Sequence, residues 1–312
     1  MNALLRNVLA VSLCLLGVVP LAAADTAPAF TKEAQGDWYV LAAHQNNKNI
    51  TVDKGTGSKI TITADGIVWP NPEKADAPLL SAKCVRAPAS TDPKKPSDPN
   101  ELISTVTGSL CPKQDAKLAA RWKITPDNDV LLLLVEVAEY KGNRNGTYSG
   151  AAPSDVIFIC QRKPLPAATN PDPAADTKRF VGTWAVLGEL DDANCARTRP
   201  QGNVVFTATE FLKRGSYNAD AKSAGGKGGW KLFEPQGGRG RIDFDFKSGI
   251  EFVGRSPSLY TFYGDDLLMV VYPEGEKGEA LKNPELRKPP THFGSDGDRN
   301  MWILRRVIEE KK

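Results

Sequence analysis

Two pairs of neighbouring aspartates, Asp191–Asp192 and Asp265–Asp266, are the first candidates in this chain for general acid–base catalysis. Glycoside hydrolysis needs two carboxyl groups held in different environments across a cleft, whereas adjacent aspartates in turn segments are usually solvated. The two histidines, His44 and His292, lie far apart, and the chain has no Gly-x-Ser-x-Gly nucleophile elbow. A hydrolase that uses surface carboxylates is therefore an unfavoured hypothesis, and we assign no catalytic residue.

Glycine-rich segments with basic residues are the second candidate for chemistry. "GGKGGW" contains Lys227, and "GGRGR" contains Arg239 and Arg241. A phosphate loop ends in Gly-Lys-Ser/Thr at the start of a helix, so both segments are interpreted instead as hairpin tips. The chain has no Cys-x-x-Cys, so we predict no metal and no cofactor. With 40 basic and 37 acidic residues the charge is too balanced to favour a nucleic-acid partner.

The first 24 residues have the pattern of a cleavable signal peptide. Arg6 precedes the apolar stretch "VLAVSLCLLGVVPLA", and the small residues Ala22 and Ala24 suit cleavage before Asp25. The apolar stretch is short for a membrane span, and no second one follows. We therefore expect a secreted or periplasmic protein with no integral membrane association after cleavage.

Export makes the cysteines informative. Cleavage removes Cys14 and leaves Cys84, Cys111, Cys160 and Cys195. An even number of cysteines in an oxidising compartment indicates disulfides, and four cysteines allow three pairings. We predict a Cys84–Cys111 bond, because both residues fall near loops of the first half, and leave the state of the other two open.

A repeated pattern gives the domain organisation. Gly-x-Trp-x-Val-Leu occurs in "GDWYVL" (36–41) and in "GTWAVL" (182–187), and "TYSGAAPSDVIFICQRK" (147–163) matches "THFGSDGDRNMWILRRV" (291–307). Between them, "DNDVLLLLVEV" matches "GDDLLMVVYPE" in the same order, which indicates a duplication. We predict domains at 34–163 and 178–308, a Pro-rich linker at 164–177 that forms an extended spacer, and a Pro-rich insertion at 86–101.

Strand signals fill both halves. "RIDFDF" (241–246) alternates, with Ile242, Phe244 and Phe246 on one face and charged residues on the other. Separators such as "YGDD" and "GGRG" suit hairpins. About eight short antiparallel strands in each half predict an all-β fold of two tandem small barrels, since closure removes exposed sheet edges.

These residues resemble a known family. "VGTWAVL", "VVFTATEFLKRGS", "GRIDFDF", "SLYTFYGDDLLMVVYPEG" and "KPPTHFGSDGDRNMWILRRV" together resemble a lipocalin-like domain recurrent in secreted planctomycete proteins. The resemblance covers nearly all of 178–307, whereas the first half matches at its ends and around "KITITADGIVW". It implies lipocalin-like barrels and export, and it implies no biochemical activity.

The Gly-x-Trp pattern has a structural interpretation. Gly36 and Gly182 let the chain bend across one end of each barrel, and the indoles of Trp38 and Trp184 plug that end. An arginine from the last strand then covers the ring, Arg162 in the first half and Arg306 or its neighbour Arg305 in the second.

The interior of the second barrel is the remaining candidate site. We predict that it is lined by Phe206, Phe244, Phe246, Tyr260, Phe262, Leu268 and Trp302. A small barrel is either filled by its own side chains or holds one ligand, and both alternatives stay open. The favoured function is an exported, non-enzymatic binding or interaction module, which would hold a small apolar ligand in the second barrel if that barrel is hollow. The alternative is a structural scaffold of the cell envelope with filled barrels.

Overall fold

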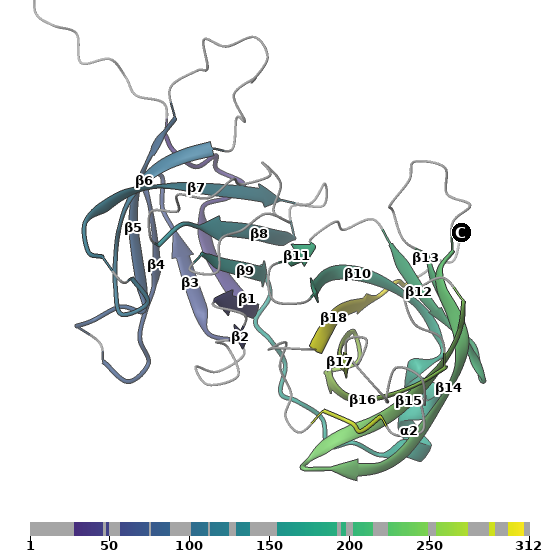
Figure 1. Cartoon of the computed structure of the whole chain (residues 1–312). Helices are drawn as coiled ribbons and strands as arrows, with labels where there is room; N and C mark the ends of the chain where they lie inside the picture. The colour runs from purple at the N-terminus through teal and green to yellow at the C-terminus, as the bar shows by residue number, and fades with distance from the viewer. Residues whose placement is uncertain are drawn as a thin grey trace, which may run out of the picture.

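The structure is a computed structural model that describes residues 28–45, 48–49, 57–74, 76–87, 101–111, 113–124, 129–137, 155–191, 195–197, 202–214, 224–248, 254–273, 287–290 and 299–308. These residues form two closed antiparallel barrels of eight strands each (Figure 1). The predicted all-β fold with two tandem barrels is confirmed. The signal segment, His292, Asp192 and most of the 86–101 insertion lie outside the described residues.

The first barrel closes through its first strand. Its strands are β1 (Gly36–Gln45), β3 (Lys59–Ile62), β4 (Gly66–Trp69), β5 (Leu80–Arg86), β6 (Glu101–Thr107), β7 (Ala116–Ile124), β8 (Val130–Val135) and β9 (Val156–Gln161). The two-residue β2 (Lys48–Asn49) extends the sheet beside β1. Tyr39 pairs with Lys59 of β3 on one side and with Gln161 of β9 on the other, so β1 joins the two ends of the sheet.

The second barrel repeats this plan. Its strands are β10 (Gly182–Asp191), β12 (Asn203–Phe206), β13 (Glu210–Arg214), β14 (Ala224–Gln236), β15 (Arg239–Ser248), β16 (Gly254–Tyr263), β17 (Leu267–Pro273) and β18 (Arg299–Arg306), with β11 (Cys195–Arg197) beside β10. The register of β1 and β10 shifts at matching places, between Val40 and Ala42 and between Val186 and Gly188. The same bulge at the same distance from each Gly-x-Trp is what a duplicated unit predicts.

One end of the second barrel is closed by α2 (Pro173–Phe180), which lies beside β14 (Figure 1). The sequence prediction of an extended spacer over 164–177 is wrong for its last five residues. Asp172 accepts hydrogen bonds from the backbone N–H groups of Ala174 and Ala175, and Pro173 suits the first helical position, so a short helix begins there. Phe180 at the end of α2 is fully buried in the second barrel.

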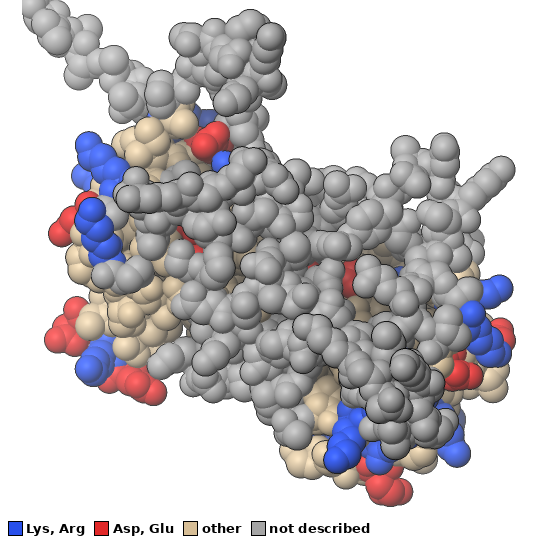
Figure 2. All heavy atoms as spheres, in the orientation of Figure 1, with Lys and Arg blue, Asp and Glu red and all other residues tan. Residues whose placement is uncertain are grey.

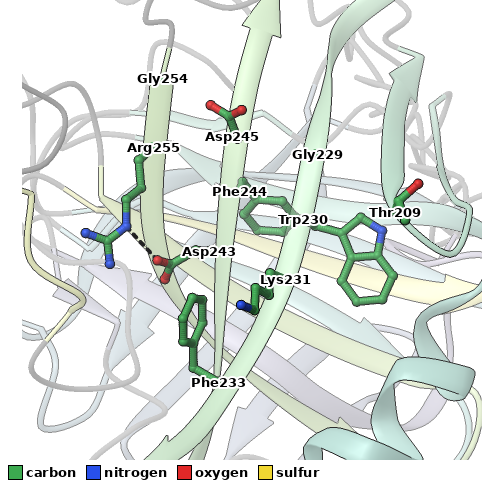
Figure 3. A pocket seen from close by; sticks show the side chains of 10 residues that line it. All are labelled: Thr209, Gly229, Trp230, Lys231, Phe233, Asp243, Phe244, Asp245, Gly254 and Arg255. Atoms are coloured by element: carbon green, nitrogen blue, oxygen red, sulfur yellow. Dashed lines mark hydrogen bonds and ion pairs between the residues drawn. The ribbon is translucent and has the colours of Figure 1, made fainter.

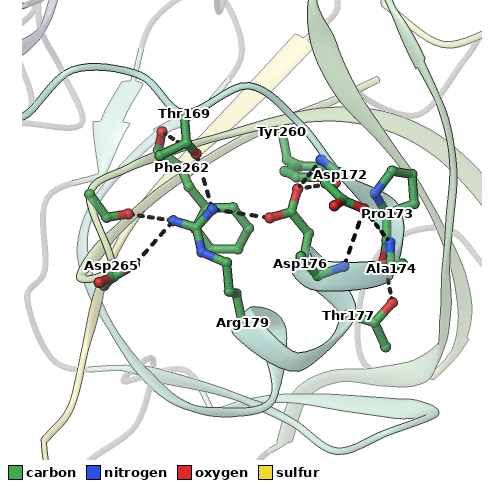
Figure 4. A network of polar contacts seen from close by, with 12 residues as sticks. Thr169, Asp172, Pro173, Ala174, Asp176, Thr177, Arg179, Tyr260, Phe262 and Asp265 are labelled. Carbon is green, nitrogen blue, oxygen red and sulfur yellow. Dashed lines mark hydrogen bonds and ion pairs between the residues drawn. The ribbon is translucent and has the colours of Figure 1, made fainter.

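A buried carboxylate holds α2 against the barrel wall (Figure 4). Asp176 is 1% exposed, and its Oδ2 accepts hydrogen bonds from the Tyr260 hydroxyl (2.8 Å) and from the backbone N–H of Asp172 (3.0 Å). Its Oδ1 accepts from Arg179 at 3.0 Å, and that guanidinium lies 4.0 Å from the ring centroid of Phe262. The helix is thus tied to two inward-facing rings of β16.

An apolar contact joins the two barrels. Outward-facing residues of β1, β8 and β9 pack against outward-facing residues of β10, β16, β17 and β18, and they form one cluster: Leu41, Ala42, Val130, Leu132, Leu134, Ile157, Ile159, Leu187, Leu259, Tyr263, Leu267, Met269, Val271, Met301 and Ile303. We call this cluster the interbarrel core. Every residue of β8, β9 and β17 is buried, because these strands bury one face in their own barrel and the other here.

The predicted Cys84–Cys111 disulfide is wrong. Cys84, Cys111 and Cys160 are free thiols, and the side chain of Cys195 lies outside the described residues. Leu110, next to Cys111, donates its backbone N–H to the carbonyl of Leu79, whereas Cys84 lies five residues further along β5. At about 3.3 Å per strand residue the two cysteines are roughly 15 Å apart, which is beyond disulfide reach.

Candidate functional site

The seven residues predicted to line the second barrel all lie in its core. Each is at most 1% exposed, and they meet side chains that sequence reasoning missed, among them Phe180, Phe211 and Trp230. The Phe244 ring lies 5.0 Å from Phe211 and 5.7 Å from Trp302 between centroids, which is direct ring contact. This packing favours a barrel filled by its own side chains over one that encloses a hydrocarbon ligand.

The Gly-x-Trp residues occupy equivalent places at one end of each barrel. Gly36 and Gly182 have φ values of 105° and 135°, which favour glycine. The Trp38 indole N–H donates to the Ala34 carbonyl at 2.7 Å, and that of Trp184 donates to the Phe180 carbonyl at 2.8 Å. Both tryptophans are fully buried.

An arginine covers each of these tryptophans. The guanidinium carbon of Arg162 lies 3.8 Å from the Trp38 ring centroid, and that of Arg306 lies 4.3 Å from the Trp184 centroid. Each guanidinium also donates to backbone carbonyls just before the tryptophan, so it bridges the last strand and the plug. Arg305 points elsewhere and pairs with Asp129 of the first barrel.

Among those residues considered for hydrolysis that the structure describes, no two carboxylates face each other across a cleft. The Asp265 side chain is 95% exposed at the β16–β17 hairpin, and Asp266 beside it is exposed as well. His44 is buried near the end of β1, and the side chain of Asp191 lies outside the described residues. Solvated aspartates of this kind lack the differing environments that acid–base chemistry requires.

A hollow of about 530 Å³ opens on the outer wall of the second barrel (Figure 3). It lies over β14, β15 and the start of β16, and its lining includes Lys231, Phe233, Asp243, Asp245 and Arg255. Asp245 pairs in register with Gly229 of β14 and with Arg255 of β16, and Gly229 leaves the wall low on its side because it carries no side chain. The "RIDFDF" alternation correctly placed Asp243 and Asp245 on the outer face.

Asp243 is the buried charge of this hollow. Its side chain is 9% exposed, and its Oδ2 accepts a 2.6 Å hydrogen bond from the Nε of Arg255 (Figure 3). Its Oδ1 has no hydrogen-bond donor, although the Nε of Arg241 lies 3.7 Å away. A buried carboxylate oxygen without a donor is costly, so a ligand that supplies one gains binding energy.

Phe233 of the lining is contacted by two cations, of which Lys231 also lines the hollow. The Arg241 guanidinium lies 4.7 Å and the Lys231 ammonium 5.4 Å from the ring centroid of Phe233. The lining thus presents a hydrogen-bond donor on Lys231 and acceptors on Asp243 and Asp245. Arg255 was not anticipated, because it lies on a different strand from Asp243 and only the sheet register brings the two together.

Among the residues that the structure describes, no group of three or more metal-ligating side chains comes together. Nor does any helix of that part of the chain have the length and hydropathy to cross a membrane. On the face shown in Figure 2, the Lys and Arg side chains of described residues are interspersed with Asp and Glu side chains.

Comparison with protein-family models and with curated proteins gives no match for this chain. The fold therefore rests on the structure itself. The resemblance to a lipocalin-like family stays a prediction from the sequence motifs.

Proposed function

We propose that this chain is an exported, non-enzymatic binding module whose second barrel recognises a small hydroxyl-rich ligand, of the saccharide class, in the outer-wall hollow. The observation that carries the proposal is the Oδ1 atom of Asp243, which is buried at the hollow and lacks a hydrogen-bond donor. The packed rings of the second barrel argue against the small apolar ligand expected from the sequence.

The chemistry of the rim favours hydroxyl groups over an ion. Two cationic and two anionic side chains line the hollow, so a ligand with a net charge meets repulsion as well as attraction. A hydroxyl group both donates and accepts, which matches Asp243 on one side and Lys231 on the other. The volume of about 530 Å³ falls within the range of small-molecule sites.

Saturation-transfer NMR of the full mature chain against a panel of mono- and disaccharides tests this proposal. We expect signal from at least one sugar, and we expect Asp243→Asn to reduce it severalfold, because the amide places a donor where the ligand's donor belongs. Lys231→Ala provides a second variant that leaves the buried pair intact. Asp65→Asn, on an exposed hairpin of the first barrel, is the matched control. Absence of any sugar signal, or a signal that neither hollow variant reduces, would refute the proposal.

The alternative function is a scaffold, favoured by the interbarrel core that joins the barrels into one apolar contact. It predicts a protein partner in place of a saccharide. Crosslinking of the tagged chain in its native envelope, followed by mass spectrometry, distinguishes the two functions.

A further inference from the structure

The two barrels differ at one level of their interiors, at the end away from the tryptophan plugs. Glu189 on β10 pairs in register with Trp302, and the equivalent pair in the first barrel is Ala43 with Phe158. Ala43 lies in the apolar core of its barrel. At this position the second barrel therefore carries a carboxylate, whereas the first barrel carries the methyl group of Ala43.

Two neighbours of Glu189, Lys213 and Tyr272, are likewise more polar than their equivalents in the first barrel. Lys213 is equivalent to Trp69, because Lys213 lies two residues after Phe211, the partner of Phe206, and Trp69 lies two residues after Ile67, the partner of Ile62. Tyr272 is equivalent to Val135, because each lies two residues after the β-strand residue that pairs with Trp302 or with Phe158. In the first barrel Trp69 packs edge-on against Phe158 with centroids 5.1 Å apart. The polar set is therefore particular to the second barrel and is not a requirement of the architecture.

These side chains form a compact arrangement around one oxygen. The Oε1 atom of Glu189 accepts hydrogen bonds from Lys213 Nζ (2.6 Å), Trp302 Nε1 (2.8 Å) and the Tyr272 hydroxyl (3.0 Å). Burial raises the pKa of Glu189, but the Lys213 charge and the three hydrogen bonds outweigh burial and lower it below its usual value. The carboxylate is ionised at neutral pH.

Aromatic rings complete the surroundings of the lysine. The Lys213 ammonium lies 4.7 Å from the ring centroid of Trp302, and the Trp302 and Tyr272 rings are 4.7 Å apart at an interplanar angle of 56°. A carboxylate with aromatic faces is the arrangement by which proteins bind organic ammonium groups. We call Glu189, Tyr272 and Trp302 the ammonium cage.

The stability of the folded barrel does not explain why these polar side chains are present. A buried ion pair is often neutral or unfavourable compared with well-packed apolar residues of similar size, and the first barrel carries such residues. The Glu189 and Lys213 side chains are 19% and 14% exposed, so solvent reaches part of this ion pair, whereas Tyr272 and Trp302 are buried. The lysine side chain has four flexible carbons, and its ammonium is well hydrated when released.

We propose that the ammonium cage is a binding site for a small primary alkylammonium group, and that Lys213 is its built-in occupant, displaced when the ligand enters. The exchange replaces one ammonium by another, so the charge balance around Glu189 is kept. This site lies inside the barrel and is independent of the outer-wall hollow, so either proposal can fail without the other.

Binding of n-butylammonium to the full mature chain tests the proposal. In the wild type we expect millimolar n-butylammonium to shift the indole N–H signal of Trp302 in a ¹⁵N-correlated NMR spectrum, with n-butanol causing no shift. Replacing the occupant by Lys213→Met should tighten n-butylammonium binding by about tenfold or more, which corresponds to about 1.4 kcal/mol. Adding Glu189→Gln to that variant should abolish the gain.

Lys59→Met is the matched control, because Lys59 pairs with Asp37 on the exposed surface of the first barrel. It should leave n-butylammonium binding at the wild-type level. No Trp302 shift in the wild type, or equal binding of n-butanol and n-butylammonium, would overturn the proposal. The wild-type titration decides the question even if Lys213→Met does not fold.

Discussion

Gly188 of the second barrel lies directly against Ile159 of the first. A Cβ atom built on Gly188 would come within 2.5 Å of the Cδ1 atom of Ile159, so the interbarrel core is closed to one more methyl group at this point. The absence of a side chain at one residue lets β10 approach β9.

Gly188→Ala therefore tests the interbarrel contact. We expect a loss of about 1–3 kcal/mol in the free energy of unfolding, the usual cost of overpacking, because Ile159 must move to admit the methyl group. Gly229→Ala is the control, since its nearest atom would be 3.6 Å away. Urea denaturation curves measure both. A change at Gly188 no larger than at Gly229 would show that the contact is loose.

Separated halves provide a second test. Residues 28–163 contain the strands of the first barrel with the buried Phe30, and residues 169–308 contain those of the second barrel with all of α2, so each half should show strand-type circular dichroism and a cooperative melt. Each half alone exposes its side of the interbarrel core, and exposed apolar patches of this kind drive association. Size-exclusion chromatography should therefore show self-association of each half and a one-to-one complex on mixing. Halves that stay monomeric and form no complex on mixing would contradict the prediction.

Arg306→Ala is expected to destabilise the second barrel. It removes the guanidinium above Trp184 and its hydrogen bonds to the carbonyls of Val181 and Arg179. The loss of these contacts should lower the free energy of unfolding by about 1–3 kcal/mol, which a thermal melt detects as a lower Tm. Arg306→Lys should recover only part of the loss, because an ammonium cannot repeat the planar stacking and the forked donation. Full recovery by lysine would show that charge alone matters at this position.

Thiol chemistry tests the corrected cysteine assignment. Burial raises the pKa of Cys84 to about 12 and that of Cys111 to about 11, so both should react slowly with a thiol reagent at pH 8 until the protein unfolds. A reductant should leave the Tm unchanged, whereas a drop in Tm would restore the disulfide hypothesis. Since the folded pKa values exceed the unfolded value of about 9, these thiols add stability below pH 9. That stability should decline as the pH rises from 9 toward 12.

The elements that depend on neighbouring residues could be predicted from the sequence. The alternation in "RIDFDF" places Phe244 inside and Asp243 outside, and the repeated Gly-x-Trp identifies the first strand of each barrel and its plug. Both signals depend on local periodicity and on a backbone conformation that glycine favours, so they need no knowledge of distant contacts. The signal for the helix after Asp172 is local too, since Asp172 caps it. The high proline content of the linker nevertheless led to the wrong prediction of an extended spacer.

Which buried faces meet, and which charges are brought together, depends on contacts between residues far apart in the sequence. The continuous apolar runs of β8 and β17 indicate strands buried on both sides, yet not that Ile159 would face Gly188 across two barrels. Likewise, Glu189 joins Lys213, Tyr272 and Trp302 through the register of four strands. Such contacts are set by barrel closure and by the fit of two distant surfaces, and a single sequence carries no local pattern that encodes them.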